Sequence, residues 1–349
     1  MVSDPAADPP ASTEPEPATE TRGRRVWRGV AAAAVAAALV HPVARLFGRS
    51  SWLADLIGHF QEPAFVVTLL AAAVVVLTRS RRLALGLLLL GAFQAVPLVR
   101  YSGSNPVAAA PGSRLKLRIL YANVLHTNGR HDDLARLIRV ERPDVIGLVE
   151  YSTEWQAGLA GVRRDYPYGV DFPAGAAGLA LWFREQPLSL NPPVQPVPGR
   201  FPFLHATFEF AGRVRHLWLV HPTSPLSRFG LAGNPELAAI AENVRAVGGS
   251  RVVVGDMNST DGSAHFRDFL NATGLRDSRL GFGRQGSWPA NLPYRIAIDH
   301  ALVSPDLAVV ARRLGPDIGS DHLPVIVDLA PAAATKPATN SDQSATSVP

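Results

Sequence analysis

Apolar residues are distributed in two different ways along this chain of 349 residues. Between residues 26 and 99 they form three long runs, at about 26–47, 63–78 and 83–99, which short polar stretches separate. From residue 114 onward they form short segments that alternate with polar positions, as in the strands and amphipathic helices of a globular domain. The pattern therefore divides the chain into an apolar N-terminal region and an α/β domain over residues 114–330.

The three apolar runs predict three transmembrane helices. The second and third contain 16–17 residues, near the lower limit of the roughly 17–25 residues that cross a bilayer. Arg28, His41, Pro42 and Arg45 interrupt the first run, so whether it spans fully is left open. The charges between the runs argue against the alternative, a soluble domain of buried core helices.

Basic residues cluster before the first run and between the second and third. Four Arg residues lie within 22–28, and Arg79, Arg81 and Arg82 form the second cluster. Positive clusters stay on the cytoplasmic side of a membrane, and three spans place both clusters on that side. We therefore expect a multi-pass protein of the bacterial cell (inner) membrane, with a cytoplasmic N-terminus and an extracytoplasmic domain.

Three segments have little to bury and predict no folded structure. Residues 1–25 are expected to be a disordered cytoplasmic tail, residues 101–113 a linker, and residues 331–349 a second disordered tail.

The net charge of +5 suggests a nucleic-acid partner until the charges are located. Residues 21–113 contain ten Arg against two acids, whereas residues 114–330 contain 23 basic and 21 acidic residues. The basicity thus belongs to the apolar region, which favours a membrane over nucleic acid. The chain has no cysteine, so disulfides, thiol catalysis and Cys-ligated metals are excluded.

Polar residues suited to catalysis recur at the ends of the predicted strands. They are Asn123 near the end of 115–124, Glu150 at the end of 144–150, His221 after 215–220, Asp256 and Asn258 after 251–254, Asp299 within 296–303, and Asp321 and His322 just before 323–329. A strand that ends on an unpaired buried charge lowers the stability of the fold. Because several predicted strands end on polar or charged residues, we infer that these residues share one polar site. Ligand sites in α/β sheets lie beyond the carboxyl ends of the strands.

This set of side chains suits phosphoester hydrolysis assisted by a hard cation. Glu and Asn oxygens are ligands that Mg²⁺ or Mn²⁺ prefers. A His oriented by an Asp is a base for water, and a further His and Asn can donate to phosphoryl oxygens as charge develops.

Five motifs of the domain resemble those of the endonuclease/exonuclease/phosphatase superfamily: Leu120–Val124, Gly147–Glu150, Val254–Asn258, Ile298–His300 and Gly319–Pro324. The resemblance implies a four-layer α/β sandwich. It also implies a metal site in which Glu150 is the principal ligand, with Asn123 beside it and Asp321 as a second carboxylate.

The resemblance implies roles for the remaining residues as well. Asp256 would position or activate the nucleophile or the leaving group, and Asn258 and His221 would hold the phosphate. His322, oriented by Asp299, would be the catalytic base or the group that polarises the phosphate.

One position departs from the family pattern. Many members carry Asp or Asn two residues after the first-strand Asn, where this chain has Leu125, so the metal is expected to have fewer protein ligands. We expect four other histidines to be structural or exposed: His126, His131, His216 and His300.

The layout is similar to that of the membrane-anchored bacterial members linked to teicoplanin-type glycopeptide resistance, which implies a lipid-phosphate substrate. We expect a metal-dependent phosphatase or phosphodiesterase whose partners are the lipid bilayer and a phosphorylated lipid. The alternatives are a membrane-anchored extracellular nuclease, with nucleic acid as substrate, and a non-catalytic membrane binding protein. The sequence identifies no protein partner.

Overall fold

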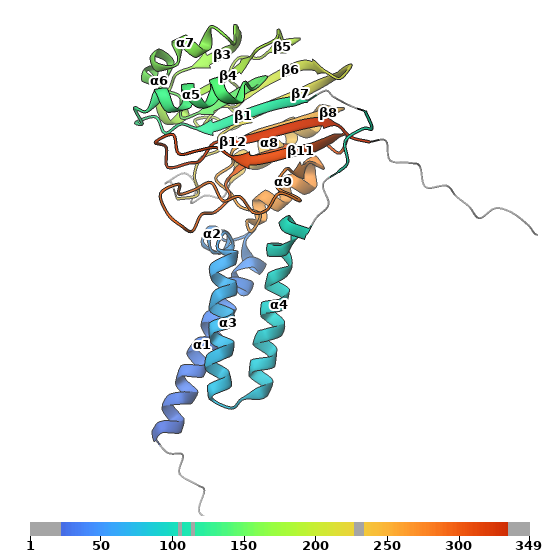
Figure 1. Cartoon of the computed structure of the whole chain (residues 1–349). Coiled ribbons are helices and arrows are strands. Elements are labelled where there is room, and N and C mark those ends of the chain that lie inside the picture. The colour runs from blue at the N-terminus through green and yellow to red at the C-terminus, as the bar shows by residue number, and fades with distance from the viewer. Residues whose placement is uncertain (1–21, 104–106, 113–115, 227–233, 334–349) are drawn as a thin grey trace, which may run out of the picture.

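The computed structural model of the protein describes residues 22–103, 107–112, 116–226 and 234–333. A helical bundle stands at one end of a layered α/β domain (Figure 1). Most of the two predicted disordered tails, residues 1–21 and 334–349, lies outside the described residues.

The bundle contains α1 (Arg22–Phe47), α2 (Trp52–Gly58), α3 (Gln61–Leu77) and α4 (Arg81–Gly103). Within the described residues, α1 and α4 are each long and apolar enough to cross a membrane, and α3 meets that test only together with α2, from which it bends by 76°. The short helix α2 lies where the sequence predicted a connecting loop. Helix α1 begins at Arg22, so the end of the predicted tail is helical.

Small residues form the centre of the bundle, and large apolar residues point outward. Ala38, Ala71 and Val75 are buried between the helices, whereas Leu46 and Phe93 are 79% and 71% exposed. A soluble domain of core helices would show the opposite arrangement, because burial of large apolar side chains drives its folding. Small residues at helix contacts are typical of helices that pack in lipid.

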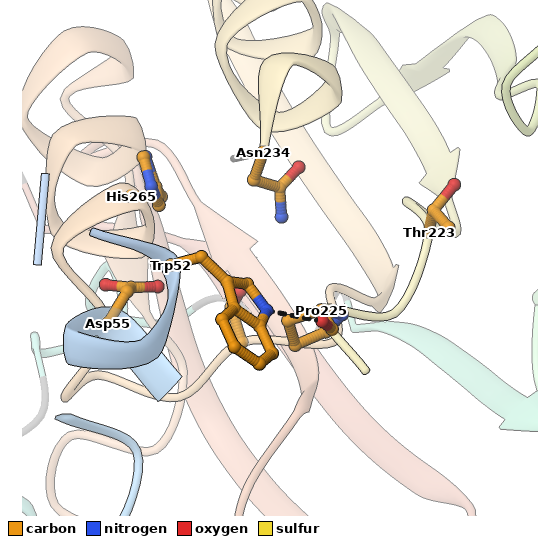
Figure 2. Close-up of a pocket in the computed structure, with 7 residues that line it drawn as sticks. Trp52, Asp55, Thr223, Pro225, Asn234 and His265 are labelled. Carbon is orange, nitrogen blue, oxygen red and sulfur yellow. Dashed lines mark hydrogen bonds between the residues drawn. The ribbon is translucent and has the colours of Figure 1, made fainter. Parts of the chain in front are cut away.

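Helix α2 is held against the domain by hydrogen bonds at both ends of its first turn. The Trp52 Nε1–H donates to the Pro225 carbonyl at 2.7 Å, as Figure 2 shows. The Asp55 carboxylate accepts from Ser263 Oγ at 2.8 Å and from the Ala264 N–H at 2.6 Å. Those groups begin α9 (Ala264–Thr273), where the helix dipole favours a negative charge.

The end of α4 is also part of the domain, which corrects the predicted linker over residues 101–113. Tyr101 is buried, and its carbonyl accepts from the N–H groups of Gly281 and Gly283 at 2.9 and 3.1 Å. The guanidinium of Arg279 lies 4.3 Å from the centre of the Tyr101 ring, a favourable cation–π distance. Helix α4 therefore continues to Gly103, because its last turn finds partners in the domain.

The domain is built from two six-stranded sheets. The first has the order β11-β12-β1-β2-β4-β3, with β11 (Leu307–Leu314), β12 (Val325–Pro331), β1 (Leu117–Asn123), β2 (Val145–Val149), β4 (Leu179–Phe183) and β3 (Tyr168–Phe172). The second has the order β5-β6-β7-β8-β10-β9, with β5 (Ser189–Leu190), β6 (Leu204–Phe210), β7 (Arg213–Val220), β8 (Ser250–Asp256), β10 (Asp299–Val303) and β9 (Arg276–Asp277).

Helices cover the outer face of each sheet, which confirms the expected four-layer α/β sandwich (Figure 1). Helices α5 (His131–Glu141), α6 (Thr153–Gly158) and α7 (Ala160–Arg163) pack on the first sheet, and α8 (Pro235–Ala246) and α9 pack on the second. The inner faces share a core that includes Ile119, Leu219 and Val254. Strands buried on both faces read as continuous apolar runs, as β2 and β8 do.

Two parallel pairs of strands determine where the polar ends meet. Strand β1 runs parallel to β2, and β7 runs parallel to β8. Their carboxyl ends therefore lie at one edge of each sheet, and the sandwich brings these edges together.

Candidate active site

Asn123 joins the two sheets at this edge. It is the last residue of β1, Glu150 directly follows β2, and Asp256 is the last residue of β8. The Asn123 Nδ2 donates to Glu150 Oε1 at 3.0 Å and to Asp256 Oδ2 at 3.1 Å. Residues that are 27 and 133 positions apart in the sequence thus form one hydrogen-bonded group.

The backbone around this group adopts conformations that few residues tolerate. Glu150 and Asn258 have φ values of 58° and 48°, left-handed conformations that cost about 1–3 kcal/mol each and cluster at functional sites. Gly255 has a φ of 157°, and a Cβ there would lie 1.9 Å from the Val220 carbonyl oxygen. Only glycine allows β8 to approach β7 this closely just before Asp256.

His322 is held in place by a chain of hydrogen bonds. The Ser320 Oγ–H donates to the Asn123 carbonyl at 2.8 Å, and the His322 N–H donates to Ser320 Oγ at 3.1 Å. The ring Nδ1–H donates to Asp299 Oδ2 at 2.8 Å, while Nε2 lies 3.6 Å from Asp256 Oδ2. Asp299 and Asp256 are register partners on β10 and β8, so the ring lies beside both carboxylates.

Burial and neighbouring charges shift the pKa values of three groups in the site away from their usual ranges. Burial lowers the pKa of His322, but Asp299 and Asp256 outweigh burial and raise this pKa to about 10. Burial raises the pKa of Asp256 to about 7 and lowers that of His221 to about 4. His322 is therefore an imidazolium at neutral pH and His221 is neutral, which favours the phosphate-polarising role for His322 over the role of base.

Asn258 and His221 complete the second-sheet side of the site. The Asn258 N–H donates to Asp256 Oδ1 at 2.8 Å, and its Nδ2 donates to the Pro222 carbonyl at 3.0 Å. His221 Nε2 lies 3.8 Å from Asp256 Oδ2, and the buried Nδ1 has no hydrogen-bond partner among the described residues.

The oxygen atoms at the Asn123 junction fit a divalent cation. Glu150 and Asp256 offer carboxylate oxygens, the kind of donor that Mg²⁺ and Mn²⁺ prefer. Asn123 presents its Nδ2 to both carboxylates, and its Oδ1 accepts from the Leu125 N–H at 3.1 Å. Asp256, Asp299 and His322 also lie close enough to share an ion. We favour the Asn123 junction, because Asp299 and His322 already bind each other.

Asp321 differs from the other two predicted ligands. Its Oδ2 accepts from the Trp288 Nε1–H at 3.0 Å, and its buried Oδ1 has no partner among the described residues. The hydrogen bonds of Asn123 reach Glu150 and Asp256 but not Asp321, and the predicted ligand set of Glu150, Asn123 and Asp321 stays a prediction.

His126 contributes to the site although we expected it to be structural or exposed. Its ring is partly exposed, and its Nδ1–H donates to Glu150 Oε2 at 2.9 Å. Burial raises the pKa of Glu150, but His126 and other partners outweigh burial and lower it. One indication of this is present in the sequence, because Leu125 departs from the family pattern at the position before His126. In the structure Leu125 has a left-handed backbone, with a φ of 56°.

The other three histidines have structural contacts, as expected. His131 packs edge-on against Trp155, and His300 Nε2 binds the Ser259 carbonyl at 2.8 Å in the core. His216 lies beside His205 on the second sheet.

A cavity of about 420 Å³ opens at the site. Six of the eight predicted residues line it: Glu150, His221, Asp256, Asn258, Asp321 and His322. The remaining two, Asn123 and Asp299, are buried behind them. The apolar part of the lining is Leu56, Phe60, Phe201, Leu226, Trp288, Ile296 and Ile298.

Three residues of the cavity come from α2 and the turn that follows it: Leu56, His59 and Phe60. No pattern in the sequence connects these residues with the site, because they belong to none of the motifs at the predicted strand ends.

Comparisons with known proteins agree with this architecture. The model of the endonuclease/exonuclease/phosphatase family matches residues 120–322. The structure of D. rerio TDP2 complexed with a single-strand DNA product has a TM-score of 0.53 and 18% identity, covering 61% of this chain and 98% of that one. A family protein from Leptotrichia buccalis C-1013-b has a TM-score of 0.50 and 17% identity, covering 61% and 99%. These identities show the fold alone, and no curated protein sequence matches the chain.

Proposed function

The chain belongs to the endonuclease/exonuclease/phosphatase family, and from this premise we propose that it is a membrane-anchored, metal-dependent hydrolase of a lipid-borne phosphate. Members of the family are hydrolases that act on phosphoester bonds and use divalent metal ions. The lipid substrate, the outer-face location and the similarity to teicoplanin-resistance members are part of the proposal.

The lining of the active-site cavity is the observation that carries the lipid assignment. Its polar end consists of the candidate catalytic groups, and its apolar wall includes Leu56 and Phe60, which adjoin the candidate spans. A phosphate at the polar end would leave an attached hydrocarbon chain against the apolar wall. The described residues that line the cavity include no Lys or Arg, whereas a nuclease needs basic residues along the nucleic-acid backbone.

The arrangement of the bundle supports the membrane anchor and its orientation. Leu46, Phe93 and other large apolar side chains face outward, where lipid would cover them. The start of α1 and the turn between α3 and α4 lie at the end of the bundle far from the domain (Figure 1). Both predicted Arg clusters are at that end, and basic clusters stay cytoplasmic. This supports the proposed orientation, with that end in the cytoplasm and the domain outside a bacterial inner membrane.

The Glu150 and Asp256 carboxylates would hold the Mg²⁺ or Mn²⁺ ion, and the Asn123 amide, which donates to both, would keep them in position. When bound, such an ion neutralises phosphate charge and makes a nearby water a stronger nucleophile.

The protein groups around the ion have separate tasks in the proposed mechanism. His322, positioned by Asp299, directs its Nε2–H into the cavity and stabilises the negative charge that develops on a phosphoryl oxygen. Asp256 is positioned to orient water and accept its proton. Asn258 and the neutral His221 hold the remaining phosphoryl oxygens.

The test uses the full-length protein in lipid nanodiscs with Mg²⁺ or Mn²⁺. We expect phosphate release from an isoprenyl pyrophosphate or from a phospholipid head group, and EDTA should stop it. A Glu150→Gln variant should be inactive, and Arg139→Ala, a change on the exposed face of α5, should be active. Rapid cutting of plasmid DNA without lipid turnover would show that the protein is a nuclease. No turnover of any phosphoester would support a binding protein.

A further inference from the structure

A second cavity, of about 460 Å³, lies between α1 and α4 at the ends nearer the domain. Its lining is His41, Pro42, Arg45, Leu46, Phe93, Gln94, Val96, Pro97, Arg100 and Arg267. None of these residues lines the active-site cavity. We propose that this second cavity binds the phosphate head group of an anionic membrane phospholipid. The inference rests on the proposed membrane anchor but not on the proposed reaction.

Three arginines from three different helices face the cavity: Arg45 on α1, Arg100 on α4 and Arg267 on α9. The described lining residues include no Asp or Glu. Guanidinium groups bind phosphate through paired N–H donors in a fixed geometry. Arginines at this end are also an exception to the trend that basic residues stay cytoplasmic, and an anionic ligand accounts for them.

Neutral acceptors take the hydrogen bonds that two of these arginines make. Arg45 Nη1 donates to the Gln61 side chain at 3.4 Å, and Arg267 Nη1 donates to the backbone carbonyls of Asp261 and Gly262. The carboxylates nearby are engaged elsewhere, since Asp268 pairs with Arg49 and Asp261 with Arg279. Among the described residues, Arg45 and Arg267 thus have hydrogen bonds but no salt bridge of their own, so both can still pair with an anion.

Buried polar atoms without partners are the second, independent observation. Gln94 lines the cavity and is 7% exposed, yet neither its Nε2 nor its Oε1 has a hydrogen-bond partner among the described residues. The Nδ1 of His41, which is equally buried, has none either. Leaving such groups unpaired is costly. The oxygens of a phosphodiester head group would accept from the Gln94 amide, and a head-group hydroxyl would satisfy its carbonyl.

The apolar part of the cavity continues onto the outer surface of the bundle. Leu46, Phe93 and Val96 line the cavity and are 79%, 71% and 62% exposed. An acyl chain can follow these side chains while the head group meets the arginines. The helix ends next to the domain are at the level of phospholipid head groups if the spans cross the bilayer. This position favours a membrane phospholipid as the occupant, bound separately from the molecule in the active-site cavity because the two cavities share no lining residue.

The experiment measures lipid retention by native mass spectrometry of the full-length protein, with phosphatidylglycerol and phosphatidylcholine as probes. We expect the wild type to retain phosphatidylglycerol about tenfold better, because both lipids carry the phosphate but the three arginines repel the quaternary ammonium that phosphatidylcholine adds. Arg45→Gln and Gln94→Leu should each remove this preference. Arg82→Gln, at the far end of α4, is the matched control and should keep it.

Two results would overturn the proposal. One is equal retention of both lipids by the wild type, and the other is unchanged preference in both Arg45→Gln and Gln94→Leu. The Glu150→Gln variant separates this site from the active site, because it should lose hydrolysis and retain the lipid preference. Extraction of the protein from membranes by alkaline carbonate would instead show that the proposed anchor is wrong.

Discussion

His322 Nδ1 lies 2.8 Å from Asp299 Oδ2, and both side chains are almost completely buried. The carboxylate fixes the ring so that Nε2 faces the cavity, and its charge favours the imidazolium form. Asp299 itself does not line the cavity, so it acts through His322 and is a positioning residue.

Asp299→Asn keeps the shape of this pair but removes the negative charge. We expect kcat to fall by about a hundredfold or more, the usual contribution of a donor that stabilises developing negative charge, with little change in KM. Steady-state kinetics on the lipid substrate measure both constants. Arg139→Ala is the control, and a kcat for Asp299→Asn within twofold of wild type would contradict the assignment.

His126→Ala tests whether the hydrogen bond with Glu150 supports metal binding. Groups that orient a metal ligand typically contribute 10–100-fold in metal affinity. We therefore expect about that increase in the Mg²⁺ or Mn²⁺ concentration for half-maximal turnover, with maximal turnover largely recovered at saturation. A metal titration in the activity assay measures this, and His216→Ala, on the second sheet, is the control. An unchanged titration curve would show that His126 is incidental to the site.

The apolar wall from α2 should affect lipid substrates selectively. Replacement of Leu56 and Phe60 by Ser removes contacts with the hydrocarbon chain, at about 1 kcal/mol for each apolar side chain that the hydrocarbon would cover. We expect KM for an isoprenyl phosphate to rise about tenfold or more, while turnover of a water-soluble aryl phosphate stays the same. Leu53→Ser is the matched control, because Leu53 is on the same helix but does not line the cavity. Equal losses on both substrates would point to damage of the fold.

Arg279 joins the bundle to the domain from a fully buried position. It pairs with Asp277 at 2.6 Å and lies over the Tyr101 ring. Arg279→Ala leaves the Asp277 carboxylate buried without this partner, which costs about 3–5 kcal/mol. We expect a clear drop in the melting temperature of the detergent-solubilised protein, and Arg139→Ala should leave it unchanged. A melting temperature equal to that of the wild type would show that other groups compensate.

The sequence by itself determined the long buried strands of the domain and the position of the candidate active site along them, but not the short or outer strands β3, β5 and β9. Runs such as Val252–Val254 are continuously apolar because the strands they form are buried on both faces. Glu150 and Asp256 directly follow or end such strands, and the ends of parallel strands meet at one edge of a sheet. Local periodicity and strand direction were therefore enough to bring together most of the candidate residues, and the family match confirmed the fold.

Only the tertiary structure decided which distant groups complete the site. Leu56 and Phe60 reach the cavity because Trp52 and Asp55 hold α2 against the domain, and nothing local in the sequence encodes those contacts. The pairing of His126 with Glu150 depends on a left-handed turn at Leu125. The charge state of His322 likewise depends on burial and on its distances to Asp299 and Asp256. Long-range contacts and desolvation exist only once the chain is folded, so they are set by the packing of the layers and not by the pattern of any one segment.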